Sequence, residues 1–376
     1  MSNISCAAPW RGLHINPRGD VKTCCAGDPN MLGNLNTQTI EEILHGPAMQ
    51  EIRQTIRSGR LHEKYCYNCI QSERYGRSER NWHNDVSPEF DCQTALDTEH
   101  LPTLIDVRWN ITCNLSCNYC GDKCSSKWAA LKQIPFKSGA RPYYEQVCDY
   151  LEKHKESIRE VALVGGEPLL LPENERLLDV IPEDCIVTLI TNMSVDLDTN
   201  KVFKKLANRK KVGWSMSFDN IDKRFEYVRY GGSWPLLVDN ILKIKKLFTQ
   251  GQWGGIHAVY NIYNATRLME FFDWAKHIGV DTHWQSLYQP DYLDPLKHSH
   301  QVRDLAQAEL EKVLARLDLT DSERSFFEQA RQNYQQPITV DLAPEFKVHI
   351  QEIEQQYHPD QQGKFVELWP EFGNLL

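Results

Sequence analysis

The sequence predicts an α/β fold: a partial (βα)6 barrel, with a small cysteine-rich domain before it and a helical segment after it. Two patterns support this prediction. Between about residues 102 and 290, short apolar runs alternate with helical patterns, which is typical of parallel βα units. Eleven of the twelve cysteines lie within the first 148 residues, which indicates metal or redox chemistry there. The expected parts are a cysteine-rich domain over 1–75, a linker over 76–101, the barrel over 102–290 and a helical extension over 291–376.

The composition is that of a globular protein. The 376 residues are 41% hydrophobic and 25% charged, and the formal net charge is −9. A net negative charge disfavours broad electrostatic binding of nucleic acid. The chain has no basic leader followed by an apolar run, and no stretch of about 18 apolar residues that could span a membrane. We therefore expect a soluble, cytoplasmic protein.

The barrel is expected to contain six strands with helices between and after them. The predicted strands are 104–109, 160–165, 186–191, 212–218, 256–261 and 282–287. The predicted helices are 143–156, 173–179, 200–208, 235–249 and 266–278, followed in the extension by 302–317, 321–334 and 343–357. In TIM-like barrels the active site lies at the carboxyl ends of the strands. Functional residues should therefore follow these strands.

A cysteine motif follows the first predicted barrel strand. Cys113, Cys117 and Cys120 are spaced as C-x₃-C-x₂-C. Three thiolates from one short loop suit an iron–sulfur cluster, and a four-iron cluster with three protein ligands leaves one iron open for a cofactor or substrate. Two alternatives are a structural zinc site and a closed, ferredoxin-like cluster in which Cys124 supplies a fourth thiolate.

A glycine-rich turn follows the second predicted strand. The apolar run 161–164 ends in Gly165, Gly166, Glu167 and Pro168. Glycines allow a ligand to approach the backbone closely, and a carboxylate there can accept hydrogen bonds from a ligand ammonium group. Alone, such a turn could simply end a strand.

Together the two motifs resemble the signature of the radical S-adenosylmethionine (SAM) superfamily, including the aromatic residue before the third cysteine, Tyr119. The resemblance implies a catalytic [4Fe–4S] cluster on Cys113, Cys117 and Cys120. The open iron of such a cluster binds the methionine part of SAM and supplies the electron that cleaves it to a 5′-deoxyadenosyl radical. The resemblance also implies that Gly165, Gly166 and Glu167 bind the methionine amino group.

Polar residues at the later strand ends are the remaining candidates for cofactor binding. The resemblance implies that such side chains contact the ribose and the methionine carboxylate of SAM. The candidates are Thr191, Asn192, Ser215, Ser217, Asp219 and Asn261, with Gln285 and Tyr288 as further pocket residues. Trp214, Trp284 and Tyr288 could belong to the core or to the pocket wall, and the core is favoured.

The N-terminal segment carries a second group of cysteines. Cys6, Cys24 and the pair Cys66 and Cys69 would suit zinc or an iron–sulfur cluster equally well, because both accept four thiolates. A hairpin is expected within 13–22, and 39–56 reads as helical with an interruption at Gly46 and Pro47.

This segment resembles the SPASM or twitch domain, which binds auxiliary clusters in radical SAM enzymes. The resemblance implies one auxiliary [4Fe–4S] cluster on Cys6, Cys24, Cys66 and Cys69, with Cys25 as an alternative to Cys24. It departs from the better-known members, in which the domain follows the barrel. The other cysteines, Cys92, Cys148 and Cys185, are expected to be buried or idle thiols.

The sequence therefore predicts a radical SAM enzyme that abstracts hydrogen from a peptide or a small metabolite, in an oxidation, a cross-link or a related modification. A reducing partner such as flavodoxin or ferredoxin is expected. The alternative is an iron–sulfur electron-transfer or scaffold protein without radical chemistry. The substrate and the oligomeric state leave no pattern in the sequence.

Overall fold

The computed structural model of the chain describes residues 4–25, 30–74, 78, 80–97, 101–136, 142–247, 254–287, 289–361 and 363–373. Tyr288, one of the predicted pocket residues, lies outside these ranges. Contacts divide the chain into two compact units. The first unit is Met1–Thr112, Lys137–Ile190 and Leu197–Gly213, and the second unit is Cys113–Phe136, Thr191–Asp196 and Trp214–Leu376.

The strands form an open sheet. They are β1 (Gly12–Ile15), β2 (Asp20–Lys22), β3 (Gly33–Asn34), β4 (Leu104–Val107), β5 (Glu160–Leu163), β6 (Ile186–Thr191), β7 (Val212–Ser217), β8 (Ile256–Tyr260) and β9 (Thr282–Ser286). Their order is β3-β2-β1-β4-β5-β6-β7-β8-β9. Parallel pairing joins β4 to β5, β5 to β6, β7 to β8 and β8 to β9. The predicted α/β fold is confirmed, and each of the six predicted barrel strands is present.

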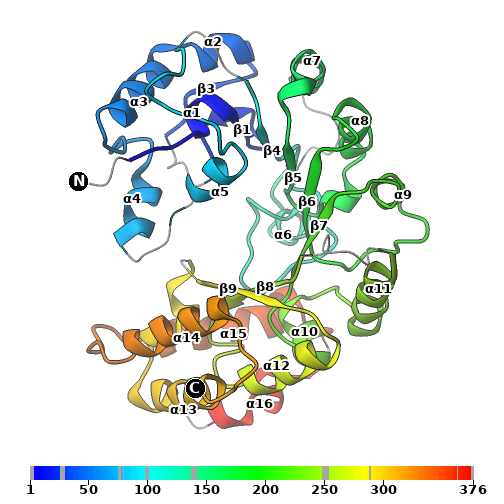
Figure 1. The fold of residues 1–376 in the computed structure, drawn as a ribbon. Helices are drawn as coiled ribbons and strands as arrows, with labels where there is room; N and C mark the ends of the chain where they lie inside the picture. Colours follow the sequence, from blue (N-terminus) through cyan, green and yellow to red (C-terminus); the bar gives the residue numbers. More distant parts are fainter. Residues whose placement is uncertain are drawn as a thin grey trace. The chain divides into compact units, whose positions relative to one another are not determined.

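The helices follow the predicted alternation (Figure 1). The first unit contains α1 (Ala8–Arg11), α2 (Ile40–Leu44), α3 (Pro47–Arg57), α4 (Tyr67–Arg74), α5 (Arg80–Asp85), α7 (Tyr144–Lys153), α8 (Glu173–Val180) and α9 (Lys201–Leu206). The second unit contains α6 (Ser126–Leu131), α10 (Asp222–Val228), α11 (Trp234–Leu247), α12 (Leu268–His277), α13 (His300–Leu314), α14 (Asp321–Asn333), α15 (Ala343–Glu352) and α16 (Phe365–Leu368). The sequence patterns did not indicate α6 or α10, and α5 lies where a linker was expected.

The predicted N-terminal hairpin is joined to the first barrel strand. Strands β1 and β2 pair antiparallel, and the turn between them uses Gly19 at a φ of +84°, a conformation that favours glycine. On its other edge β1 pairs parallel with β4, with His14 opposite Asp106. Figure 1 shows β1 beside β4. The cysteine-rich segment therefore shares a sheet with β4 instead of forming a separate layer.

The helical extension belongs to the core of the second unit. Phe346, Phe365 and Trp369 are buried in one cluster with Tyr227 and Tyr263. The indole Nε1 of Trp369 donates to the carbonyl of Tyr263 at 2.8 Å. Helix α15 continues into a π-helical turn over Ile353–Tyr357. Because so much aromatic surface is buried here, the extension stabilises the second unit by packing against it.

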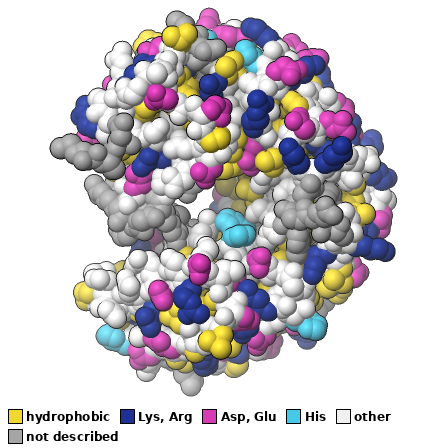
Figure 2. All heavy atoms as spheres, viewed as in Figure 1, with side chains coloured by type: hydrophobic (Ala, Val, Ile, Leu, Met, Phe, Trp, Pro, Cys, Tyr) yellow, Lys and Arg dark blue, Asp and Glu magenta, His cyan; other side chains and the backbone are white. Residues whose placement is uncertain are grey.

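Surface charges are mixed on the face drawn in Figure 2, where Lys and Arg side chains are interspersed with Asp and Glu. Among the described residues, no helix has both the length and the apolar run needed to cross a bilayer.

Candidate functional site

The loop that carries Cys113, Cys117 and Cys120 begins the second unit. The N–H of Cys113 donates to Ser126 Oγ at 3.0 Å, and the indole of Trp128 donates to the carbonyl of Cys117 at 2.8 Å. The backbone N–H groups of Ser116 and Asn118 donate to the carbonyls of Tyr230 and Val228 at 3.0 and 2.8 Å. These bonds on both sides of Cys117 fix the path of the loop, so the three thiols project from a defined backbone.

A buried charge pair lies beside this loop. Arg229 Nη1 is 3.9 Å from Cys117 Sγ, and Nη2 is 3.3 Å from Asp219 Oδ2. The guanidinium carbon lies 5.3 Å from the centre of the Tyr119 ring, and the Tyr119 hydroxyl donates to Asp219. Asp219 also accepts the N–H of Val259 at 2.6 Å. Arg229 thus contacts Cys117 and also the predicted site residues Tyr119 and Asp219.

The electrostatics of this group follow from burial and from that arginine. Burial raises the pKa of the Cys117 thiol, and the positive charge of Arg229 opposes the rise. Burial also raises the pKa of Tyr119 well above its usual value. For Arg229, burial alone would lower the pKa, but the charges of Tyr119, Asp219 and Cys117 raise it above the usual value. Arg229 is therefore a permanent buried cation next to Cys117, one of the predicted cluster ligands.

The end of β6 also reaches the cysteine loop. Asn192 Nδ2 lies 3.7 Å from Cys113 Sγ and donates to Asn114 Oδ1 at 2.9 Å. Asn114 in turn donates to the carbonyl of Ser194 at 2.6 Å. The Thr191 hydroxyl accepts the N–H of Met193 at 3.1 Å, a hydrogen bond within the turn after β6.

The other predicted strand-end residues are placed differently. Ser215 and Ser217 are half-buried on the same face of β7, opposite the buried Trp214 and Met216. Asn261 is fully buried. Its amide donates to the carbonyl of Val259 at 2.7 Å and accepts the N–H of Tyr263 at 2.9 Å. The amide of Asn261 thus bonds the turn after β8.

The Gly-Gly-Glu turn lies in the first unit, packed on the residues that precede Cys113. A Cβ atom on Gly166 would lie 2.2 Å from the carbonyl oxygen of Thr112, which only glycine avoids. Gly165 has a φ of +138°. The N–H of Glu167 donates to the carbonyl of Thr112 at 2.8 Å, and its Oε1 accepts the N–H of Leu169 at 3.1 Å. Close backbone packing is therefore why this turn needs glycines.

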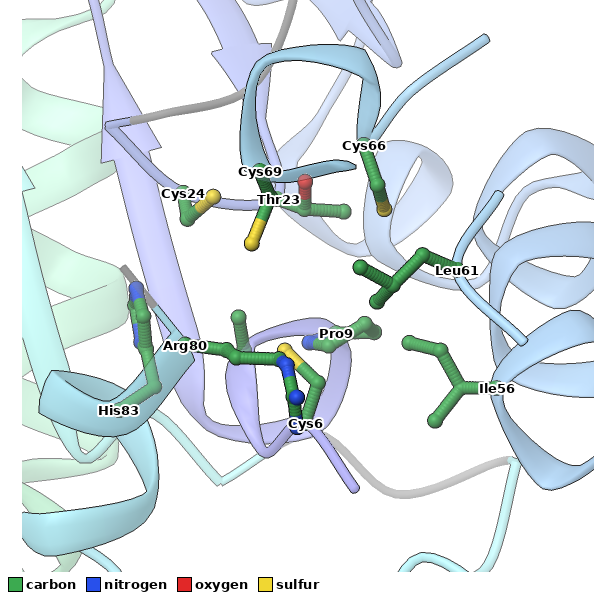
Figure 3. A pocket seen from close by; sticks show the side chains of 11 residues that line it. Cys6, Pro9, Thr23, Cys24, Ile56, Leu61, Cys66, Cys69, Arg80 and His83 are labelled. Atoms are coloured by element: carbon green, nitrogen blue, oxygen red, sulfur yellow. The ribbon is translucent and has the colours of Figure 1, made fainter. Parts of the chain in front are cut away.

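The four N-terminal cysteines meet at one cavity in the first unit (Figure 3). Cys6, Cys24, Cys66 and Cys69 all line this cavity. Cys6 precedes α1, Cys24 follows β2, Cys66 immediately precedes α4, and Cys69 lies in the first turn of α4. The remaining wall consists of Ala8, Pro9, Thr23, Ile56, Leu61, Arg80 and His83. Residues distant in sequence are thus brought to one site, and Cys25 is not part of its wall.

These thiols are strongly desolvated. Burial raises the pKa of Cys6 to about 12 and that of Cys69 to about 11, and it also raises the pKa values of Cys24 and Cys66. Cys69 Sγ lies 3.5 Å from Glu73 Oε1, and Glu73 is paired with Arg80. Thiols of this kind lose their protons when a metal binds, so binding and deprotonation are coupled.

Both donor sets fit iron–sulfur clusters. Thiolates are the usual ligands of such clusters, and the chain offers three on one loop and four around one cavity. Within the described residues, no three His, Cys, Asp or Glu side chains meet closely enough to hold a single metal ion. The four N-terminal sulfurs instead border a space between them.

Sequence reasoning missed Arg229 and His358. Ser116 Oγ lies 3.0 Å from Nε2 of the buried His358, whose ring stacks on Tyr230 at 3.9 Å and 7°. Burial lowers the pKa of His358 to about 4, so the ring is neutral. Neither residue belongs to a cysteine or glycine motif, and each reaches the loop only through the fold.

Comparison with known proteins gives two family matches. The model for the radical SAM superfamily matches residues 110–280, and the SPASM model, an iron–sulfur cluster-binding domain, matches residues 6–70. A curated relative, 7-carboxy-7-deazaguanine synthase from Clostridium acetobutylicum, is 33% identical over 94 residues. That match spans 24% of this chain and 38% of the relative.

Solved structures also show similarity at low identity. SuiB from Streptococcus suis, bound to S-adenosylmethionine, is 17% identical with a TM-score of 0.43, over 72% of this chain and 59% of that one. The structure of anSMEcpe with bound AdoMet is 17% identical with a TM-score of 0.40, over 56% and 58%. The chain thus spans less than two thirds of the length of these relatives.

The family matches fall on the two cysteine groups that the geometry singles out. The radical SAM model begins just before Cys113, and the SPASM model spans Cys6 to Cys69. A radical SAM domain implies a [4Fe–4S] cluster and SAM, and a SPASM domain implies auxiliary iron–sulfur ligation. The chain therefore carries a radical SAM domain over residues 110–280 and, ahead of it in the sequence, a SPASM domain over residues 6–70.

Proposed function

We propose that this protein cleaves SAM reductively at a cluster held by Cys113, Cys117 and Cys120, and that it abstracts hydrogen from a peptide or small-metabolite substrate. The observation that carries the proposal is the fixed cysteine loop with Arg229 and Asn192 beside its sulfurs. When bound, the cluster and SAM supply the electron and the 5′-deoxyadenosyl radical. An oxidation, a cross-link or a related modification of that substrate would follow.

The chain's own residues would hold and orient the cofactor. Glu167 would accept hydrogen bonds from the methionine ammonium, with Gly165 and Gly166 giving it backbone access. Thr191, Asn192, Ser215 and Ser217 would line the ribose and carboxylate side. The carboxylate of Asp219 is already engaged by Tyr119, Arg229 and Val259. Asp219 is thus better suited to positioning Tyr119 and Arg229 than to contacting SAM directly, and the local bonds of Asn261 suit the same kind of role.

The N-terminal cavity would hold one auxiliary [4Fe–4S] cluster. Its four thiols leave no open ligand position, which favours electron transfer over substrate binding. The placement of Cys24 in the cavity wall supports Cys24, and not Cys25, as the ligand. Zinc also accepts four thiolates, but among the described residues no three such side chains lie close enough together to hold a single metal ion, which favours a cluster.

We also propose a domain organisation for the chain. We assign residues 1–75 to the auxiliary domain, 76–101 to a linker, 102–290 to the barrel and 291–376 to the extension. A cytoplasmic location and reduction by a flavodoxin or ferredoxin stay predictions.

The deciding experiment is anaerobic reconstitution with iron and sulfide, followed by dithionite and SAM, with chromatographic detection of 5′-deoxyadenosine. Cys117→Ala is the control, because it removes one ligand of the catalytic cluster and leaves the N-terminal cysteines intact. Nucleoside formed by the wild-type chain alone supports the radical enzyme. A fully loaded wild-type protein that never cleaves SAM would favour the electron-transfer alternative.

A further inference from the structure

Besides the four thiols, the wall of the auxiliary cavity contains three polar side chains, Thr23, Arg80 and His83. His83, on α5, lines the cavity and is 3% exposed. Neither Nδ1 nor Nε2 of its ring has a hydrogen-bond partner among the residues that the structure describes. Buried polar groups of this kind are rare, because leaving them unpaired is unfavourable. The ring nitrogens therefore point to a partner that the protein alone does not supply.

The neighbouring polar groups are already engaged elsewhere. His14 Nδ1 lies 3.0 Å from Asp106 Oδ2, and Arg108 donates to both oxygens of Asp106 at 3.1 Å. Arg80 is paired with Glu73 and donates to the carbonyl of Ser5 at 2.8 Å. The rest of the wall near His83 is apolar or sulfur, apart from Thr23. The remaining candidate partner for the ring is whatever occupies the cavity.

The position of the ring is set by the backbone of β1. A Cβ on Gly12 would lie 2.9 Å from His83 Cε1, so the ring packs directly on the strand between the segments that carry Cys6 and Cys24. Burial lowers the pKa of His83 to about 4, so the ring is neutral at physiological pH and carries one N–H donor and one acceptor. A neutral donor held at the cavity wall can bond to a sulfur without adding a charge.

We propose that His83 donates an N–H hydrogen bond to a sulfur of the auxiliary iron–sulfur cluster and thereby raises the reduction potential of that cluster. This inference rests on the proposed function, which places a cluster in this cavity. Hydrogen bonds to cluster sulfurs stabilise the more negative, reduced state, and residues around the ligands tune iron–sulfur sites in this way. His83 is thus a positioning and tuning residue and not a ligand.

The test isolates the auxiliary cluster. In a parent protein carrying Cys113→Ala, Cys117→Ala and Cys120→Ala, only the N-terminal cavity retains its thiols. His83→Leu removes both ring nitrogens, whereas His83→Gln keeps an N–H donor. His154→Leu is the matched control, because His154 directly follows the last residue of α7, Lys153, and is absent from the cavity wall. Each protein is reconstituted anaerobically, and iron and sulfide per chain, thermal unfolding and the midpoint potential from an EPR-monitored redox titration are measured.

The inference predicts unchanged iron content in all four proteins. It predicts a more negative midpoint potential for His83→Leu, and potentials near that of the parent for His83→Gln and His154→Leu. A His83→Leu protein with the parent's potential and EPR signal would overturn it. Loss of iron from both His83 variants while they remain folded would also overturn it, in favour of direct ligation by the ring. A parent that takes up no cluster would instead refute the auxiliary-cluster part of the proposed function, and the inference with it.

Discussion

At the scale of single residues, the feature with the largest consequences is the buried cation Arg229. A buried charge is unfavourable unless it is paired, and Arg229 is paired with Asp219 and lies over the ring of Tyr119. It lies within 3.9 Å of Cys117, from which it is separated by 112 residues. The arginine therefore places a positive charge beside the cysteine loop and also keeps Asp219 stable in the interior.

Replacing Arg229 with Met should lower the free energy of unfolding by about 3–5 kcal/mol, because Asp219 would be left as a buried, uncompensated charge. Arg229→Lys should lower the free energy of unfolding by less, since lysine keeps the positive charge but not the planar geometry of the guanidinium. Urea unfolding of the three proteins measures the effect. The control is Arg331→Met, whose partner Glu311 is about half exposed, with an expected loss below about 1 kcal/mol. Equal losses in the Arg229→Met and Arg331→Met variants would contradict this account.

Some site residues could be predicted from sequence and others could not, for a physical reason. Cys113, Cys117, Cys120 and the Gly-Gly-Glu turn are local patterns, so their spacing is visible in the chain. Arg229 acts on Cys117 only because the backbone of 228–230 runs beside the cysteine loop. Long-range contacts of this kind leave no periodicity to detect.

At the scale of elements, the Gly-Gly-Glu turn and the segment before Cys113 are packed backbone to backbone. Gly166 is the tightest point, with the carbonyls of Thr112 and Ile111 within 2.6 Å of where a Cβ would lie. Backbone atoms cannot move aside as a flexible side chain would. The turn and the start of the cysteine loop are thus positioned by each other.

Gly166→Ala should destabilise the protein by roughly 1–3 kcal/mol and reduce iron uptake at the catalytic site, because the new methyl group displaces the backbone before Cys113. Gly213→Ala is the control, since its Cβ would meet only an ordinary contact at 3.5 Å with Thr188. Thermal unfolding and iron per chain measure both effects. If the two alanine variants behaved alike, close packing at Gly166 would not be the cause.

The C-terminal helices were predicted as helices, but their role in the core was not. Amphipathic patterns reveal a buried face without naming what covers it. His349 on α15 illustrates this, since Nε2 lies 3.1 Å from Tyr263 Oη and Nδ1 lies 3.3 Å from Tyr292 Oη. Burial, and secondarily the neighbouring His358, lower the pKa of His349 to about 4.

Stability should therefore fall on acidification between about pH 6.5 and pH 4, by about 1.4 kcal/mol per pH unit from His349. In that window the unfolded chain binds a proton to this histidine and the folded chain does not, so acid favours unfolding. Above about pH 6.5 the histidine is neutral in both states, so it no longer makes the free energy of unfolding depend on pH. The free energy of unfolding, measured by urea unfolding at several pH values, should depend less steeply on pH for His349→Gln than for the wild type. If the free energy of unfolding of His349→Gln depended on pH as steeply as that of the wild type, His349 would not be buried in its neutral form.

At the scale of the whole molecule, the chain offers two separate cysteine sites in different units. The loop with Cys113, Cys117 and Cys120 lies in the second unit, and the four-thiol cavity lies in the first. Their functions should therefore be separable by mutation.

Cys69→Ala should abolish product while leaving 5′-deoxyadenosine formation within about threefold of wild type, on the order of 0.7 kcal/mol in activation free energy. The reason is that the mutation removes one auxiliary ligand without touching Cys113, Cys117 or Cys120. Chromatography of the nucleoside and mass spectrometry of the substrate measure the two outcomes. Cys185→Ala, a buried cysteine outside both sites, is the control. Loss of SAM cleavage in Cys69→Ala alone would mean that the two sites do not act separately.

Strands such as β5 and β6 were predictable because each contains a short apolar run that precedes a helical pattern. The pairing of β1 with β4 was not, since parallel partners about 90 residues apart leave no hairpin signal. Nor did the polar composition of 76–101 predict α5, on which His83 lies.

Because β1 is bonded on one edge to β2 and on the other to β4, the cysteine-rich segment is not a portable module. A fragment ending at residue 75 would expose the backbone groups of Gly12–Ile15 along a strand edge, which favours association with other chains. A transfer of this cysteine-rich segment to another scaffold would have to include the chain up to Val107, and therefore also β4, the first strand of the barrel.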